Sequence, residues 1–364
     1  MTASLRTALE GARARPRPLL AVRDLRVEFR YGRSRVGVVD GASFEIGPGE
    51  ARGLVGESGS GKTVTALSIM GLLPRGRAIV TGGEIEFDGR RLDRMSPRDL
   101  RSLRGREVAM IFQEPMTSLN PAFTVGNQIA EAVHRHRGMG RRESWKRAVE
   151  MLELVGIPAP ERRAKEYPHS FSGGMRQRVM IAMAVACGPK LLIADEPTTA
   201  LDVTIQASIL DLLRSLREEL GLAVLLVTHD LGVVADFCEQ MTVLYAGQTV
   251  ETGSTREVLG GPLHPYTGGL LASMPRPEHL GGDLAVIPGQ VPHPGLMPSG
   301  CRFHPRCPHY GPGTCDGGEP ALQSVDRGRA TRCVRVQRGE AVDPASGFGP
   351  APTSLARSRG EDRL

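Results

Sequence analysis

The segment GESGSGKT, from Gly56 to Thr63, constrains this chain more than any other part of its sequence. Gly56, four further residues and then Gly61, Lys62 and Thr63 match the phosphate-binding pattern G-x-x-x-x-G-K-[ST]. Glycines let the backbone turn its N–H groups toward a phosphate, and a helix that begins near Lys62 would point its positive end the same way. In this interpretation Lys62 lies in an accessible loop and binds the outer phosphates, while the Thr63 hydroxyl binds magnesium. A plain glycine-rich turn is the alternative, so the surrounding sequence has to decide.

Length and composition indicate a globular chain without a membrane span. Its 364 residues suggest about two or three domains and are enough for a sizeable core. Of these residues 40% are apolar, and no run of about 18 uncharged apolar residues occurs. The first twenty residues lack the apolar stretch of a secretory signal, so the chain is expected to stay in the cytoplasm.

The net charge of +6 belongs to an N-terminal arm. Residues 1–35 contain nine arginines and only three acidic residues, which accounts for the whole excess. Such an arm could touch anionic lipid or RNA, but a solvated tail is the preferred interpretation. We therefore predict no nucleic-acid partner.

The segment LLIADEP predicts a buried strand that ends in two acids, Asp195 and Glu196. In a parallel sheet the carboxyl ends of the strands face the ligand. Asp195 is then expected to bind Mg²⁺ and Glu196 to reach an attacking water. Two surface carboxylates at the end of a strand are the structural alternative, which the phosphate loop upstream makes less attractive.

A helix and a second buried strand are predicted to follow. Apolar residues repeat at helical spacing between Thr204 and Leu220, and Gly221 is placed to end the helix. The run AVLLVTHD then reads as a strand that ends at His229. A strand, a helix and a parallel strand form a right-handed crossover, so the core is predicted to be α/β. His229 could be an ordinary satisfied histidine, but its position favours contact with the γ-phosphate.

The segment FSGGMRQRVMIAMAVACGPK points to a family. Ser172, Gly173 and Gly174 precede a helix expected from about Met175, which makes a second anion-binding helix start. Together with the phosphate loop and the two acids, this segment resembles the signature motif of the ATP-binding cassette (ABC) family. In that family the signature completes the ATP site of a partner subunit. Met175 stands where many members have glutamine, and we expect the site to tolerate this.

The resemblance covers roughly residues 20–275 and implies a role for each motif. Gln113 matches the Q-loop, which links the γ-phosphate site to the transmembrane subunit, Asp202 the D-loop and His229 the switch histidine. Glu196, His229 and Gln113 are the predicted catalytic residues. Magnesium is assigned to Thr63, Gln113 and Asp195. Either Phe29 or Tyr31 is expected to stack on adenine, with Tyr31 preferred. The full predicted nucleotide-binding set is Tyr31, Gly56, Ser58, Gly59, Ser60, Gly61, Lys62, Thr63 and Asp195, and the signature set is Ser172, Gly173, Gly174 and Met175.

Three further segments resemble one branch of this family, the importers of peptides, nickel and related solutes. They are QEPMTSLNPAFTVGNQIAE (113–131), HPYTGGLLASMP (264–275) and SGCRFHPRCPHY (299–310). The resemblance implies the first ATPase subunit of an importer at the cytoplasmic face of the membrane. Its implied partners are a second ABC ATPase, two transmembrane permeases and an extracytoplasmic solute-binding protein. The solute itself is chosen by those partners.

Four of the six cysteines, Cys301, Cys307, Cys315 and Cys333, fall within the last part of the chain. In a reducing compartment such a group argues for a metal rather than disulfides. The spacing lacks the C-x₂-C pairs of a zinc ribbon. We favour a [4Fe–4S] cluster, which resembles what some members of this branch carry, with zinc or no metal as alternatives. Cys187 and Cys238 are expected to be buried apolar residues.

The predicted fold is an α/β nucleotide-binding domain of the P-loop type, with a parallel core sheet, an antiparallel β subdomain and a helical signature subdomain. The expected parts are a basic arm (1–18), the ATPase domain (19–275, with its helical subdomain at about 90–170), a Cys-rich extension (276–340) that begins with a linker near 276–298, and a disordered tail (341–364). A soluble ABC ATPase that acts on ribosomes or DNA is the rival function. Such proteins usually carry two cassettes or inserted modules, whereas this chain has one phosphate loop.

Overall fold

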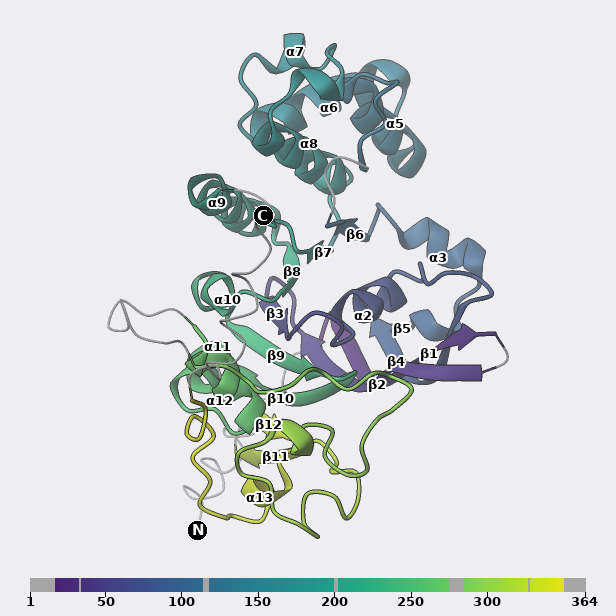
Figure 1. Cartoon of the computed structure of the whole chain (residues 1–364). Helices are drawn as coiled ribbons and strands as arrows, with labels where there is room; N and C mark the ends of the chain where they lie inside the picture. The colour runs from purple at the N-terminus through teal and green to yellow at the C-terminus, as the bar shows by residue number, and fades with distance from the viewer. Residues whose placement is uncertain are drawn as a thin grey trace, which may run out of the picture.

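The computed structural model describes residues 17–32, 34–113, 118–199, 202–274, 285–326 and 328–349 (Figure 1). Its strands are β1 (Leu20–Tyr31), β2 (Ser34–Ile46), β3 (Ala51–Val55), β4 (Ala78–Phe87), β5 (Arg90–Arg91), β6 (Val108–Ile111), β7 (Leu191–Asp195), β8 (Ala223–Thr228), β9 (Gln240–Tyr245), β10 (Gln248–Ser254), β11 (Gln323–Asp326) and β12 (Arg329–Thr331). Its α-helices are α2 (Lys62–Ile69), α3 (Pro97–Leu103), α5 (Val125–Arg137), α6 (Arg141–Leu154), α7 (Pro160–Arg163), α8 (Gly173–Val185), α9 (Val203–Leu220), α10 (Leu231–Phe237), α11 (Thr255–Gly260), α12 (Pro265–Ala272) and α13 (Val334–Gln337). Short 3₁₀ turns lie at Leu92–Arg94, Pro168–Ser170 and His304–Arg306.

A central sheet organises the larger part of the protein. Among the described residues its strands lie in the order β11-β12-β10-β9-β3-β8-β7-β6. The run from β9 to β6 is parallel, and β3, β7 and β8 are buried along their whole length. Continuous apolar sequences suit strands that are covered on both faces. The predicted strands before Glu196 and His229, and the helix that ends at Gly221, are therefore confirmed.

The second sheet is antiparallel, in the order β2-β1-β4-β5. It packs with α2 and one face of the central sheet around an apolar cluster that includes Leu25, Phe44, Ile69 and Phe87. The expected antiparallel subdomain is thus present beside the parallel core.

Helices α5, α6, α7 and α8 form a separate lobe, at the top of Figure 1. Apolar side chains on facing sides of the helices build its interior, among them Ile129, Val133, Leu152 and Val179. Ser172 caps the start of α8, and Gly138, in a left-handed conformation, ends α5. The lobe is reached from β6 and returns to the core through α8 into β7, so it begins later than the predicted residue 90 and extends to the end of α8.

The C-terminal extension is built onto the central sheet. Strand β12 pairs with β10, and β11 pairs with β12 on the outside. Phe303 is buried against Tyr245 and Tyr266, at ring-centroid distances of 5.2 and 5.4 Å. The extension therefore shares a core with the central sheet.

Part of the predicted arm, linker and tail falls outside the described residues, which omit 1–16, 275–284 and 350–364. Residues 285–298 and 341–349 pack on the folded protein and on each other: Ile287 and Phe348 lie against the main core, and the Val286 N–H donates to the Gly349 carbonyl at 3.0 Å. Within the described ranges, no helix combines the length and the apolar character that crossing a membrane requires.

Candidate nucleotide-binding site

The phosphate loop connects β3 to α2, as the sequence predicted. Gly56 and Gly61 have φ values of 155° and 99°, which side-chain-bearing residues rarely adopt. A Cβ atom on Gly56 would lie 2.2 Å from the Leu244 carbonyl oxygen. Glycine is therefore required at this position both by backbone conformation and by the closeness of β9.

Lys62 is buried, with only 6% of its surface exposed, and this corrects the expectation of an accessible lysine. Its Nζ donates to the carbonyl oxygens of Gly56 at 2.7 Å and Glu57 at 3.0 Å. Burial lowers the pKa of Lys62, while the nearby carboxylates of Glu196 and Asp195 act in the opposite direction. The loop thus wraps around its own lysine and holds the ammonium inside.

The loop also fits a phosphate ligand. The Ser60 hydroxyl is buried and has no hydrogen-bond partner within the described residues. A buried polar atom without a partner is unfavourable unless a ligand or water satisfies it. A cavity of about 770 Å³, here called the nucleotide cavity, is lined by Gly56, Glu57, Ser58, Gln113, Glu196, His229, Leu270, Gly289, Gln290 and Val291.

Asp195 ends β7 next to the start of α2. The Thr63 hydroxyl donates to its Oδ1 at 3.4 Å, so two of the three residues assigned to magnesium lie together. Burial raises the pKa of Asp195, the Glu196 charge adds to this effect, and the Thr63 hydrogen bond opposes it. A carboxylate with this environment gains from a divalent cation, whose charge would offset the burial. The third residue, Gln113, lines the nucleotide cavity and bonds to Glu196 instead.

Glu196 is the centre of a polar cluster. It has a left-handed backbone conformation, with φ of 46°, which is uncommon outside glycine and is often found at functional sites. Its carboxylate accepts hydrogen bonds from Thr199 Oγ1 at 2.7 Å and Gln113 Nε2 at 3.2 Å, and His229 Nδ1 lies 3.1 Å away.

The protonation of Glu196 follows from these contacts. Burial, the largest single influence, would raise its pKa, but the hydrogen bonds from Thr199 and His229 together with nearby positive charge, that of Lys62 included, lower the pKa overall. The side chain is therefore an unprotonated carboxylate that faces the nucleotide cavity. Such a group can orient a water molecule and accept its proton.

The signature residues lie apart from this cluster. Ser172 and Gly173 are exposed at the start of α8, where Ser172 Oγ accepts the Met175 N–H at 3.4 Å. None of the signature residues is among those that line the nucleotide cavity. Asp202 caps α9 by accepting the Ile205 N–H at 2.9 Å. The start of α8 is thus exposed to solvent.

The residue that stacks on adenine stays a prediction. Tyr31 lies at the end of β1 and is 64% exposed, whereas Phe29 is half-buried against the apolar cluster of the second sheet. Neither of them lines the nucleotide cavity.

The four clustered cysteines come together in the extension. Cys301, Cys307, Cys315 and Cys333 line one cavity of about 20 Å³. Burial raises the pKa of Cys301 to about 11 and of Cys307 to about 12. No group of three or more His, Cys, Asp or Glu side chains in the described part of the chain has an arrangement that could hold a metal ion. Cys187 and Cys238 are buried in the main core, as expected.

Several residues at the site were not found from the sequence. Thr199 follows the two acids closely enough to have been suspected, since it lies three residues after Glu196. Tyr266 belongs to the HPYT segment, but no pattern indicated that its hydroxyl accepts the Glu57 N–H at 2.8 Å. Arg306, which belongs to the extension, forms an ion pair with Glu57, and no local sequence motif predicts this contact.

A buried loop lysine, a strand-end aspartate beside a threonine and an unprotonated glutamate together define a P-loop nucleotide-hydrolysing protein. Residues 39–199 match the family described as "ABC transporter", and residues 250–315 match "Oligopeptide/dipeptide transporter, C-terminal region".

Relatives and solved structures agree with these matches. A putative peptide import ATP-binding protein of Brucella abortus is 49% identical over 92% of this chain and 97% of its own length. A protein of Brucella melitensis with the same description is 49% identical over 88% of this chain and 98% of its own length. A dimeric bacterial ABC transporter cassette has a TM-score of 0.57 and 32% identity, and covers 65% of this chain and 99% of its own. The same cassette in a post-hydrolysis state with ADP and Pi gives a TM-score of 0.57, 31% identity and the same coverage.

The chain belongs to the ABC transporter ATPase family, and its C-terminal region is of the oligopeptide/dipeptide transporter type.

Proposed function

We propose that this chain hydrolyses ATP to drive an importer of di- and oligopeptides or related solutes such as nickel. The observation that carries the proposal is the union, in one chain, of a complete hydrolytic cluster with a C-terminal region of the oligopeptide/dipeptide transporter type. The Brucella relatives are themselves described as peptide import proteins.

Within the site, we propose Glu196 as the base for the attacking water. His229 and Gln113, both within hydrogen-bond reach of Glu196, would contact the γ-phosphate, so their positions would depend on whether it is bound. Lys62 and the N–H groups of the phosphate loop bind the outer phosphates. Thr63 and Asp195, with Gln113, would hold magnesium, whose charge stabilises the leaving phosphates.

The partners we propose are a second ABC ATPase, two permeases and an extracytoplasmic binding protein. The exposed start of α8, away from the nucleotide cavity of its own chain, supports a site completed by a second ATPase. The two ATPases would then sit together at the cytoplasmic face of the membrane.

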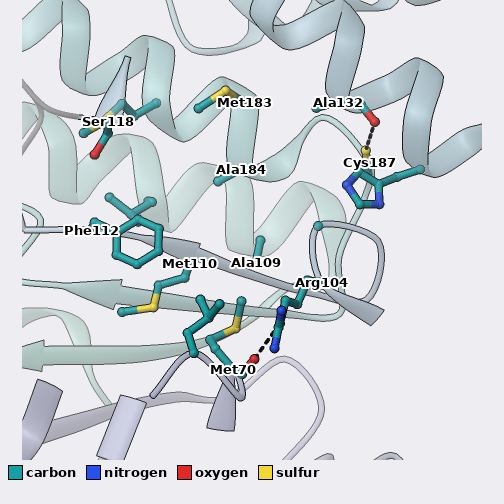
Figure 2. A pocket seen from close by; sticks show the side chains of 15 residues that line it. Met70, Arg104, Ala109, Met110, Phe112, Ser118, Ala132, Met183, Ala184 and Cys187 are labelled. Atoms are coloured by element: carbon teal, nitrogen blue, oxygen red, sulfur yellow. Dashed lines mark hydrogen bonds between the residues drawn. The ribbon is translucent and has the colours of Figure 1, made fainter. Parts of the chain in front are cut away.

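A groove beside the site supports contact with a permease (Figure 2). This cavity of about 630 Å³ lies between the core and the helical lobe, and its lining is mostly apolar. Phe112 and Met110 border it on the β6 side, and Met183 and Ala184 border it on the α8 side. Phe112 is 43% exposed and directly precedes Gln113, so an occupant of the groove would be coupled to the Glu196 cluster. Phe112→Ser should abolish co-purification with the permeases, whereas the exposed Leu296→Ser in the extension should not.

The decisive experiment is solute uptake. Cells that lack this gene should lose uptake of a labelled dipeptide, a labelled oligopeptide or Ni²⁺, and the wild-type gene should restore it while Glu196→Gln should not. Genes for two permeases, a second cassette and a secreted binding protein beside this gene would agree. Unchanged uptake of all these solutes, together with co-sedimentation of the protein with ribosomes or DNA, would favour the rival soluble ATPase.

We further propose that the cavity between the four cysteines takes a [4Fe–4S] cluster. The support is the donor set, because four thiols from distant positions line one small cavity. The cluster would require the thiols to lose their protons and move into a ligand arrangement that the described conformation lacks. Zinc on the same residues is the alternative.

Anaerobic purification tests this proposal. The protein should be brown and contain iron and acid-labile sulfide, and Cys307→Ser should remove both, whereas the control Cys187→Ser in the main core should keep them. Zinc alone, or folded protein without any metal, would contradict it.

A further inference from the structure

The extension reaches back to the phosphate loop through one arginine. Arg306 lies in the 3₁₀ turn His304–Arg306, between Cys301 and Cys307. Its Nη1 donates to Glu57 Oε2 at 2.8 Å and its Nη2 to Glu57 Oε1 at 3.1 Å. A two-pronged pair of this kind fixes direction as well as distance.

Arg306 is itself held rigidly. It is 6% exposed, and its Nε donates to the Pro288 carbonyl at 2.8 Å. Its guanidinium lies 5.7 Å from the ring centre of Tyr245, and Nη2 also reaches the carbonyls of Ile287 and Gly289 at 3.4 Å. An arginine with so many contacts has little conformational freedom, so its hydrogen bonds to Glu57 are preorganised.

Glu57 is a structural part of the phosphate loop. Its N–H donates to Tyr266 Oη at 2.8 Å, and its carbonyl accepts from Lys62 Nζ at 3.0 Å. The path of the loop backbone around Lys62 is therefore set partly by what holds Glu57. Gly289, the carbonyl of which faces Arg306, also lines the nucleotide cavity.

Charge gives Arg306 a second effect. Glu57 brings a carboxylate into a loop that must receive a triphosphate, and two like charges at close range repel. The positive charge of the Arg306 guanidinium offsets the negative charge of this carboxylate, and its hydrogen bonds keep the carboxylate turned toward the extension.

We propose that Arg306 is a positioning residue for ATP binding, through which the cysteine-rich extension sets the affinity of the phosphate loop. It acts on Glu57 and does not touch the reacting atoms. The proposal rests on ATP hydrolysis at this loop and is independent of which solute is imported.

The test uses the full chain and measures its Kd for the non-hydrolysable analogue AMP-PNP with Mg²⁺. Arg306→Gln should raise Kd by about tenfold, the effect expected of one uncompensated charge near the ligand. Adding Glu57→Gln to this variant should return Kd to within about threefold of wild type, because the repelling carboxylate is gone.

The matched control is Arg329→Gln. Arg329 also joins the extension to a cassette glutamate, Glu251, at 3.3 Å, but it does not contact the phosphate loop. This variant should lose thermal stability and keep the wild-type Kd. A simple attachment role for Arg306 predicts the same behaviour for both arginines.

The proposal is overturned if folded Arg306→Gln binds the analogue like wild type, if Arg329→Gln weakens binding equally, or if Glu57→Gln gives no rescue. Should Arg306→Gln fail to fold, Arg306→Lys keeps the charge and loses the fork. It is expected to raise Kd by about threefold, and an unchanged Kd would then be decisive against the proposal. If Arg306 proves to have no effect on ATP binding, the assignment of the chain as an ATPase still stands, because Glu196→Gln tests ATP hydrolysis separately.

Discussion

Replacing Glu196 by glutamine separates catalysis from nucleotide binding in this site. The carboxylate accepts from Thr199 and Gln113 at one oxygen and lies beside His229 at the other. A glutamine whose carbonyl takes the first position keeps both donors, and its amide lies beside His229 Nδ1. The folded structure should therefore be kept, with a stability change below about 1 kcal/mol.

The magnitude follows from what is lost. Glutamine retains size and polarity but cannot accept the proton of the attacking water. Removing a general base slows a reaction by about 10²–10⁴-fold, which corresponds to a barrier higher by about 3–5 kcal/mol. ATP binding should persist because Lys62, Thr63 and Asp195 are untouched. The variant should accumulate as an ATP-bound dimer with the second ATPase, since hydrolysis no longer opens the pair.

The assay combines phosphate release with size-exclusion chromatography in MgATP, on the chain alone and on the complex with the second ATPase and the permeases. Glu219→Gln, on the exposed side of α9, is the control and should hydrolyse ATP like wild type. Near-normal hydrolysis by the Glu196→Gln complex would place the base elsewhere and refute the reasoning.

Three other predictions concern the same site. Lys62→Ala should abolish MgATP binding in a nucleotide titration; it should also lower the free energy of unfolding by about 1–3 kcal/mol in chemical denaturation, because two loop carbonyls lose their donor. Gly56→Ala should prevent nucleotide binding because its Cβ meets the Leu244 carbonyl, whereas Gly37→Ala, with open space around it, should bind normally. If Glu196 is the base, as proposed, its carboxylate is the active form, and because its pKa lies below the usual 4.5 the loss of kcat/KM that Glu196 causes should be centred below pH 4.5; a step above pH 4.5 that is present in wild type and absent from the residual activity of Glu196→Gln would contradict this.

Much of the core was predictable because short stretches of sequence determine its strands and the ends of its helices. The strands β7 and β8 are apolar up to their last residues, Asp195 and Thr228, and Gly221 ends α9 with a φ of 63°. The strand β11 was not predictable for the opposite reason. All four of its residues are exposed, so no alternation marks it, and it is held by backbone pairing to β12.

The same distinction explains the site. Gly56, Lys62, Asp195, Glu196 and His229 stand in short motifs whose chemistry is visible in the residue types. The burial of Lys62 was missed because a pattern says which ligand a lysine binds, and does not say which carbonyls it bonds when the loop closes on itself.

The Arg306–Glu57 pair joins residues 249 positions apart, so no window of sequence could contain it. Composition did not help either, because arginines occur throughout the chain. Structure shows why arginine is used here: Arg302, Arg306 and Arg332 are each at most 9% exposed, and each donates to carbonyl oxygens around it. Five fixed donors let one side chain tie several backbone segments together where few apolar residues are available. A buried charge that loses its partner raises the free energy of the folded protein, so the contacts of each arginine are expected to be kept or lost together. The extension and the phosphate loop are therefore expected to move together, so a change in the position of Arg306 should also change the position of Glu57.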